Sequence, residues 1–200
     1  SFDEAGLAKL KYIISIAGAG IAIFAGNCSQ MASSSFSREG KALYDLKAMP
    51  IDNNLIVKAK FWHAFTYIII SDLIISLIIV VLNLLLGCPF FASEVIKILL
   101  FMALNVMAIS LLLVFIDMFI DTANPKLQWE NPTAAFKQNM NSVIAMFLSI
   151  VVDAIAVILA VFALPKNDLG QIILSVIFII IAAPIGAKYF KYTAKKISVM

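Results

Sequence analysis

Residues 62–86 read WHAFTYIIISDLIISLIIVVLNLLL, from Trp62 to Leu86. A helix of about 20 largely apolar residues is long enough to cross a bilayer. Here the apolar residues lie all around the helix, which is typical of a helix that contacts lipid on one side and other helices on the other. This stretch therefore predicts a membrane-spanning helix.

The composition of the whole chain agrees with this prediction. Of its 200 residues, 62% are hydrophobic and 14% are charged, against about 45–50% and about 25% in soluble proteins. A soluble fold has too little interior to bury that much apolar surface. The same composition argues against a disordered chain, a disulfide scaffold and a nucleic-acid partner.

Four further stretches have the same character, and segments rich in Gly, Pro, Asn and Ser separate them. We therefore expect an all-α, polytopic membrane protein, a bundle of about five transmembrane helices that forms a single transmembrane domain. The five predicted spans are residues 12–33, 62–86, 95–120, 143–164 and 169–187 of the domain 1–200.

The basic residues predict the orientation, because cytoplasmic loops carry an excess of Lys and Arg. Of the 15 basic residues, 11 fall in the loops 34–61 and 121–142 and the tail 188–200, which the spans place on one face. We expect these segments, and so the C-terminus, in the cytoplasm. Ser1 is then outside, and an odd number of spans with an external start suggests a C-terminal portion of a longer chain.

The first of these loops contains a short amphipathic pattern. Leu43, Leu46 and Met49 recur every three residues, Ser37 can cap the helix, and Pro50 ends it. The pattern predicts a helix over residues 38–49 across the cytoplasmic mouth of the bundle. Such a helix either rests on lipid headgroups or docks onto a partner protein.

Each of the two long loops contains a distinctive string. The first loop reads Ser37-Arg38-Glu39-Gly40-Lys41 with Tyr44, Leu46-Lys47-Ala48-Met49-Pro50-Ile51 and Lys58-Ala59-Lys60, and the second reads Pro125-Lys126-Leu127-Gln128-Trp129-Glu130-Asn131 with Ala135-Phe136-Lys137-Gln138-Asn139. Together these strings resemble ABC exporter permeases of the type-2 class, closest to a group of large permeases common in Gram-positive bacteria. The resemblance covers about residues 12–190 and implies a bacterial cytoplasmic membrane.

The resemblance implies that the short helix is a coupling helix in a groove of a separate ATP-binding cassette subunit. No G-x-x-x-x-G-K-[ST] string occurs, so ATP and Mg²⁺ are expected in that partner and no cofactor in this chain. A second permease copy or half is a further expected partner. The implied contact residues are Arg38, Glu39, Lys41, Tyr44, Leu46, Lys47 and Pro50, and the second loop contributes Trp129, Glu130 and Lys137.

Three acidic residues, Asp72, Asp117 and Asp153, fall within predicted spans. A charge at the centre of such a helix costs about 2.5–3.5 kcal/mol on insertion scales. Asp72 and Asp153 are expected near mid-membrane, and Asp117 near the cytoplasmic end of its span. They either line a polar or proton-coupled path, or they are neutral or hydrogen-bonded to Ser and Asn side chains inside the bundle.

The first span has a face of small residues, because Gly18, Ala22 and Gly26 stand four apart. This spacing lets two helices approach closely. The face is a contact either with a second permease copy or with helices of the same chain.

The sequence holds no nucleophile–base arrangement, and its single histidine, His63, cannot form a multi-ligand zinc site. We therefore expect no enzyme, no catalytic residue and no metal. The leading hypothesis is the permease subunit of an ATP-driven exporter. The alternatives are an ion-coupled secondary transporter that uses the intramembrane aspartates, and a membrane assembly subunit that does not transport.

Overall fold

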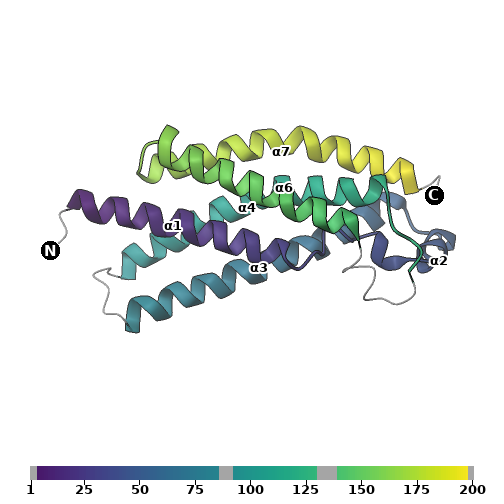
Figure 1. Cartoon of the computed structure of the whole chain (residues 1–200), viewed down its shortest axis with the longest axis horizontal. Coiled ribbons are helices and arrows are strands. Elements are labelled where there is room, and N and C mark those ends of the chain that lie inside the picture. Colours follow the sequence, from purple (N-terminus) through teal and green to yellow (C-terminus); the bar gives the residue numbers. More distant parts are fainter. Residues whose placement is uncertain (1–3, 86–91, 130–138, 198–200) are drawn as a thin grey trace.

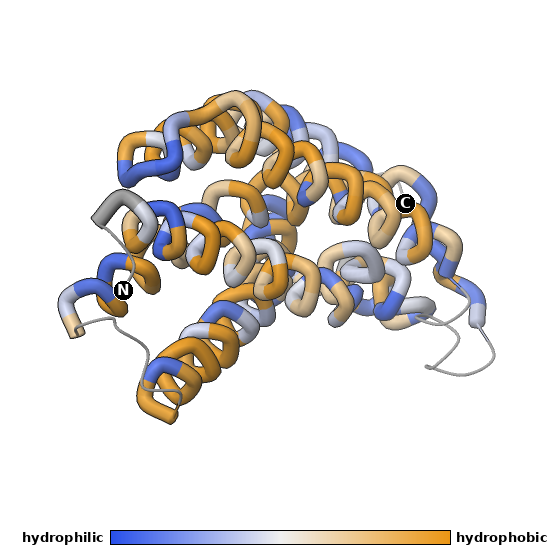
Figure 2. The backbone as a smooth tube through the Cα atoms, turned by 60° about the vertical axis from the view of Figure 1, so that its left-hand side comes forward, coloured by the Kyte–Doolittle hydropathy of each residue, from blue (hydrophilic) through white to orange (hydrophobic). Residues whose placement is uncertain are grey.

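A computed structural model describes residues 4–85, 92–129 and 139–197. Within these ranges the secondary structure is helical throughout. Five of the helices are long and apolar enough to cross a membrane, and Figure 2 shows apolar residues along most of their length. The predicted all-α bundle of five membrane-spanning helices is therefore confirmed.

The long helices run back and forth between two ends of the bundle (Figure 1). We call these the N-terminal end, where the chain begins, and the C-terminal end, where α2 and the end of α7 lie. The helices are α1 (Glu4–Asn27), α3 (Asn53–Leu85), α4 (Ala92–Ala123), α6 (Met140–Ile158) and α7 (Asp168–Ile197), and a 3₁₀ turn η1 (Ser37–Glu39), a short α2 (Ala42–Ala48) and a π-helical turn η2 (Leu159–Ala163) complete the described elements.

The predicted end of the first span is wrong, and the last helix extends beyond its predicted span. The first span was expected over residues 12–33, but α1 ends at Asn27, and hydrogen-bonded turns occupy residues 28–36. The fifth span was expected to end at residue 187, but α7 continues to Ile197. This polar extension stays helical because Tyr189, Thr193 and Ile197 are buried against the rest of the bundle.

Helix α4 is the centre of the bundle. It packs against α1, α3, α6 and α7, and 61% of its most apolar segment is buried, against 11% for α3. The hydrophobicity of α3 is therefore mostly on its outer surface. In a bilayer such a surface contacts lipid or another membrane helix, which is why the apolar residues of α3 surround the whole helix.

The small-residue face of α1 lies inside the chain. A Cβ atom at Gly18 would lie 2.6 Å from Met102 Sδ on α4, and one at Gly26 would lie 3.0 Å from Ile68 on α3. Ala22, between them, is completely buried. These small residues let α3 and α4 approach α1. In this structure the small-residue face is therefore a contact between helices of the same chain.

Candidate functional site

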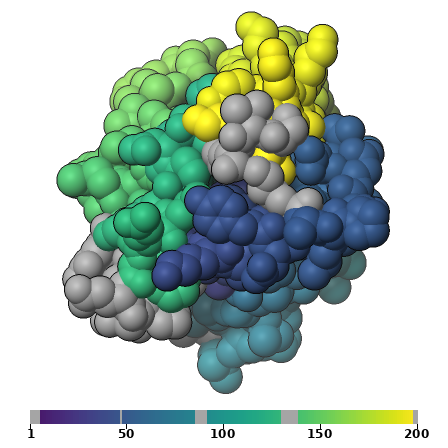
Figure 3. All heavy atoms as spheres, turned by 90° about the vertical axis from the view of Figure 1, so that its right-hand side faces the viewer, coloured from purple at the N-terminus to yellow at the C-terminus, as the bar shows by residue number. Residues whose placement is uncertain are grey.

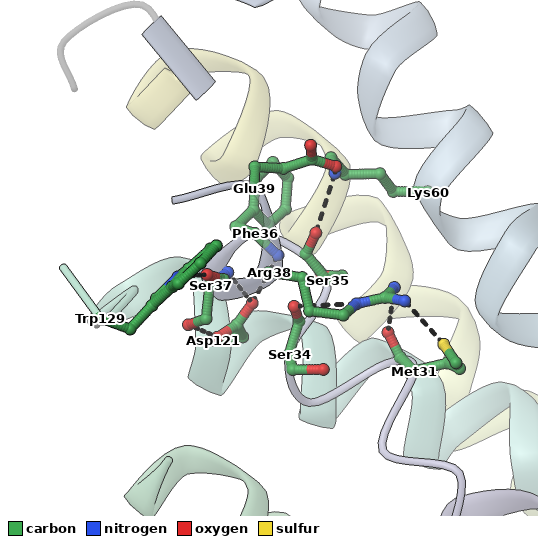
Figure 4. A network of polar contacts seen from close by, with 10 residues as sticks. All are labelled: Met31, Ser34, Ser35, Phe36, Ser37, Arg38, Glu39, Lys60, Asp121 and Trp129. Carbon is green, nitrogen blue, oxygen red and sulfur yellow. Dashed lines mark hydrogen bonds and ion pairs between the residues drawn. The ribbon is translucent and has the colours of Figure 1, made fainter. Parts of the chain in front are cut away.

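The C-terminal end of the bundle is organised around one buried carboxylate, Asp121, near the end of α4 (Figure 4). Asp121 accepts hydrogen bonds from the backbone N–H groups of Phe36 at 2.6 Å and Ser37 at 3.1 Å, and from the Ser37 hydroxyl. The amide of Asn141, at the start of α6, donates to the same carboxylate at 3.3 Å. Asp121 therefore joins the loop after α1 to α4 and α6.

Ser37 also binds the second long loop. Its hydroxyl oxygen accepts the backbone N–H of Lys126 at 2.9 Å, and its carbonyl accepts the indole N–H of Trp129 at 3.0 Å. The Trp129 ring lies against Gly40, where an added Cβ would be 2.8 Å from the ring. Gly40 has φ +52 and ψ −128, a conformation almost confined to glycine. The two loops therefore form one structure.

The next residue, Arg38, folds back onto its own loop. Its guanidinium donates to Ser34 O at 3.3 Å, to Met31 Sδ at 2.7 Å and to Met31 O at 3.4 Å. Burial lowers the pKa of the Arg38 guanidinium, and the negative charges of Glu39 and Asp121 oppose that effect. Arg38 thus closes the turns that follow α1.

Glu39 connects the loop to α3. It forms an ion pair with Lys60, whose ammonium also donates to Ser35 O at 2.8 Å and lies 5.1 Å from the centre of the Phe36 ring. The Lys60 side chain is only 13% exposed. Together with the bonds of Asp121, this ion pair ties residues 35–39 to three of the long helices.

Helix α2 follows directly and has an inner and an outer side. Leu43 is fully buried, and Leu46 packs against the same hydrophobic core. Lys41 is exposed, Tyr44 is 54% exposed and Met49 is 50% exposed. Residues of this segment lie on the surface of the C-terminal end, seen face on in Figure 3. Some hydrophobic residues of this segment therefore pack into the core, and others are exposed on the surface.

The prediction of one helix over residues 38–49, capped by Ser37, is wrong. The Ser37 side chain binds Asp121 and Lys126 instead of capping a helix. Gly40, with its positive φ, then separates the 3₁₀ turn η1 from α2. The pattern of three leucine and methionine residues located α2 correctly but could not reveal that Met49 faces away from the core.

The predicted contact residues divide into two groups. Arg38 and Glu39 are bound within the chain, and Leu46 packs inward, whereas the side chains of Lys41, Tyr44 and Pro50 are exposed. The contact of this set with a partner stays a prediction. Trp129 lies in the network described above, and the predicted site residues outside the described parts are Glu130, Lys137 and the side chain of Lys47.

The three intramembrane aspartates form none of the hydrogen bonds of this network, although Asp117 lines a small cavity together with Met31 and Ser33. Asp72 and Asp117 are buried, and Asp153 is partly buried. Each has one buried carboxylate oxygen without a hydrogen-bond partner among the described residues. Among the described residues, no Ser or Asn side chain donates a hydrogen bond to these three carboxylates, so that predicted alternative is not observed.

Sequence reasoning missed the role of Asp121. The residue lies one turn after Asp117 and falls in the predicted second loop, where a solvated carboxylate is the ordinary expectation. The serine-rich string around Ser37 could have indicated a buried carboxylate, because its hydroxyl and backbone N–H donors at a membrane boundary need a hydrogen-bond acceptor. The spacing of residues along the sequence does not indicate which residue is that acceptor.

Within the described ranges, no group of three or more His, Cys, Asp or Glu side chains is arranged to hold a metal ion. The chemistry of the site is that of a hydrogen-bonded polar contact between helices.

Comparison of the chain with protein-family models, with curated proteins and with solved structures found no match.

Proposed function

We propose that this chain is a membrane-spanning permease subunit of an ATP-driven exporter, with the C-terminal end of its bundle in the cytoplasm of a bacterium. A separate ATP-binding cassette subunit, which carries ATP and Mg²⁺, would dock on α2. The observation that carries this proposal is the placement of α2. It is a helix of 7 residues between two membrane-spanning helices, and it exposes Tyr44 at one end of the bundle, as does Met49 directly after it.

The contacts behind α2 support a coupling role. Leu43 enters the hydrophobic core, Gly40 contacts Trp129, and Glu39 binds Lys60 on α3. Through Ser37 the same segment binds Asp121 on α4. A partner that moves α2 would therefore act on several helices together, and nucleotide-driven closure would favour one of two helix arrangements.

Co-purification with the ATP-binding subunit encoded by a neighbouring reading frame tests this proposal. Tyr44→Asp places a charge on the exposed side of α2 and leaves its buried side intact, so we expect loss of the complex and of substrate-stimulated ATPase activity. Lys191→Glu is the matched control, because Lys191 is also exposed, near the same end of the bundle, but on α7. If Tyr44→Asp and Lys191→Glu both bind the ATPase like the unaltered chain, α2 is not the coupling helix.

A second candidate is an ion-coupled secondary transporter. The observation that favours it is the orphaned carboxylate oxygen of Asp72, Asp117 and Asp153, because an ionisable group inside a membrane bundle commonly marks an ion or proton path. Transport by reconstituted protein that continues without ATP and stops when the proton gradient collapses would favour this candidate. Asp153→Asn should then abolish transport, whereas Asp45→Asn, on the exposed side of α2, should not.

A further inference from the structure

A cavity lies at the N-terminal end of the bundle, opposite the α2 end. Its volume is about 400 Å³, and its lining comes from the beginnings of α1, α4 and α7, including Lys11, Tyr12, Lys97, Phe101 and Gln171. A cavity of 300–1,000 Å³ is the usual size for a small-molecule site. This space is therefore large enough for a ligand of many atoms.

The floor of the cavity is a buried polar network. Gln171, which is 3% exposed, accepts hydrogen bonds through Oε1 from Ser15 at 2.6 Å and from Asn105 at 3.2 Å. Asn105 in turn accepts the hydroxyl of Ser175 at 2.9 Å. Gln171 lines the cavity. The network therefore fixes the side-chain oxygen of Gln171, and the amide nitrogen forms no hydrogen bond among the described residues.

Charges of both signs line the walls. Lys11 and Glu94 form an ion pair with each other. Lys97 on α4 and Asp168 at the start of α7 form neither a hydrogen bond nor an ion pair within the described part of the chain, and both line the cavity. The cavity therefore presents one cation, Lys97, and one anion, Asp168, that form no hydrogen bond among the described residues, together with the side-chain amide of Gln171. The charge of Lys97 also acts on Glu94.

The cavity lies where the apolar part of the helices begins. Lys11 precedes the apolar stretch of α1, and Lys97 and Asp168 lie within the first two turns of α4 and α7. Deeper in the lining, Ile98 and Phe101 are apolar. A membrane–water boundary is the depth at which a lipid presents its headgroup, and apolar lining beneath the charges suits an amphiphile.

We propose that this cavity binds a zwitterionic headgroup that carries an ammonium and a phosphate. The phosphate accepts hydrogen bonds from Lys97 and from the Gln171 amide nitrogen, and the ammonium pairs with Asp168. The same zwitterion occurs on a membrane lipid and on a free headgroup, and the experiment below separates these sources. This proposal does not require an ATP-binding partner, so its test is independent of the proposed coupling role of α2.

The test is a titration of the purified full chain in detergent, measured by isothermal titration calorimetry. The probes are dihexanoyl phosphatidylethanolamine, its chain-free headgroup glycerophosphoethanolamine, and the anionic dihexanoyl phosphatidylglycerol. We expect saturable binding of the phosphatidylethanolamine, weakened about tenfold in Lys97→Gln and in Asp168→Asn, the size expected for the loss of one charged hydrogen bond. Lys166→Gln is the matched control, because Lys166 is exposed at the same end but does not line the cavity.

Ala8→Trp provides an independent variant, because Ala8 lines the cavity and the larger side chain fills it without changing a charge. It should abolish binding, with an unfolding temperature like that of the unaltered chain. Weaker binding of glycerophosphoethanolamine than of the short-chain lipid identifies a lipid, and equal binding identifies a free headgroup. Unchanged affinity in both Lys97→Gln and Asp168→Asn, or equally tight binding of phosphatidylglycerol, overturns the proposal.

Discussion

The indole N–H of Trp129 donates a hydrogen bond to the carbonyl of Ser37 at 3.0 Å, across 92 positions of sequence. This bond joins the two long loops, and the contact between Trp129 and Gly40 completes the joint. A change in either loop should therefore affect the other.

Asp121→Ala should be the most damaging single change at the C-terminal end. It leaves the buried N–H groups of Phe36 and Ser37 and the Asn141 amide without their acceptor. Buried donors left unsatisfied cost about 1–3 kcal/mol each, so we expect a loss of at least about 3 kcal/mol in the free energy of unfolding. Chemical denaturation of the detergent-solubilised chain measures it.

The same variant has a spectroscopic signature. The chain has two tryptophans, so in a Trp62→Phe background the fluorescence reports Trp129 alone. Because the joint depends on Asp121, Asp121→Ala should shift that emission to longer wavelength. Asp45→Asn, an exposed change on α2, is the control and should leave both stability and emission unaltered. Unshifted emission in Asp121→Ala would show that the Trp129 environment is independent of the carboxylate.

Gly40→Ala should destabilise the protein for two reasons. The residue has a positive φ, and its new Cβ would lie 2.8 Å from the Trp129 ring. A backbone conformation of this kind costs about 1–3 kcal/mol for a residue other than glycine. The control is Gly20→Ala in α1, where an added Cβ meets nothing within 4 Å. Because alanine favours a helix over glycine by about 1 kcal/mol, Gly20→Ala should be neutral or stabilising in the same thermal unfolding assay.

The Lys60–Glu39 ion pair should contribute more than a surface pair. Lys60→Met removes a poorly exposed ammonium that also binds Ser35 O, so it should cost more than Glu39→Gln. A double-mutant cycle on unfolding free energies isolates the pair, and we expect a coupling of about 1 kcal/mol, the upper end for exposed pairs. A coupling of zero would mean that Lys60 acts through Ser35 and Phe36 and not through Glu39.

Alanine substitution at two adjacent residues of α2 should affect the stability of the protein to very different extents. Leu43 is fully buried, so Leu43→Ala should reduce stability by about 2–5 kcal/mol. Tyr44 is 54% exposed, so Tyr44→Ala should change stability by less than about 0.5 kcal/mol. Thermal unfolding of the two variants side by side measures the difference. Equal losses would mean that α2 packs against the bundle differently in solution.

Much of the fold was predictable from composition alone. Each span is a run of about 20 largely apolar residues, and a bilayer forces such a segment to satisfy its backbone hydrogen bonds internally, so a helix is the expected solution. The helix ends were less predictable. Helix α1 ends at Asn27, where polar residues such as Ser29 and Gln30 begin, and α7 continues past its apolar stretch because Tyr189 and Thr193 pack against the bundle.

The sequence by itself determined that this protein spans a membrane, about where its helices lie and which loops hold its polar residues, because hydrophobicity and charge are local properties. Only the tertiary structure decided how the polar residues pair. Asp121 was one acidic residue among several, and it became the centre of the joint because folding brings Ser37 and Asn141 to it. Inside a bundle a polar group is stable only with a partner, and that partner can lie anywhere along the chain.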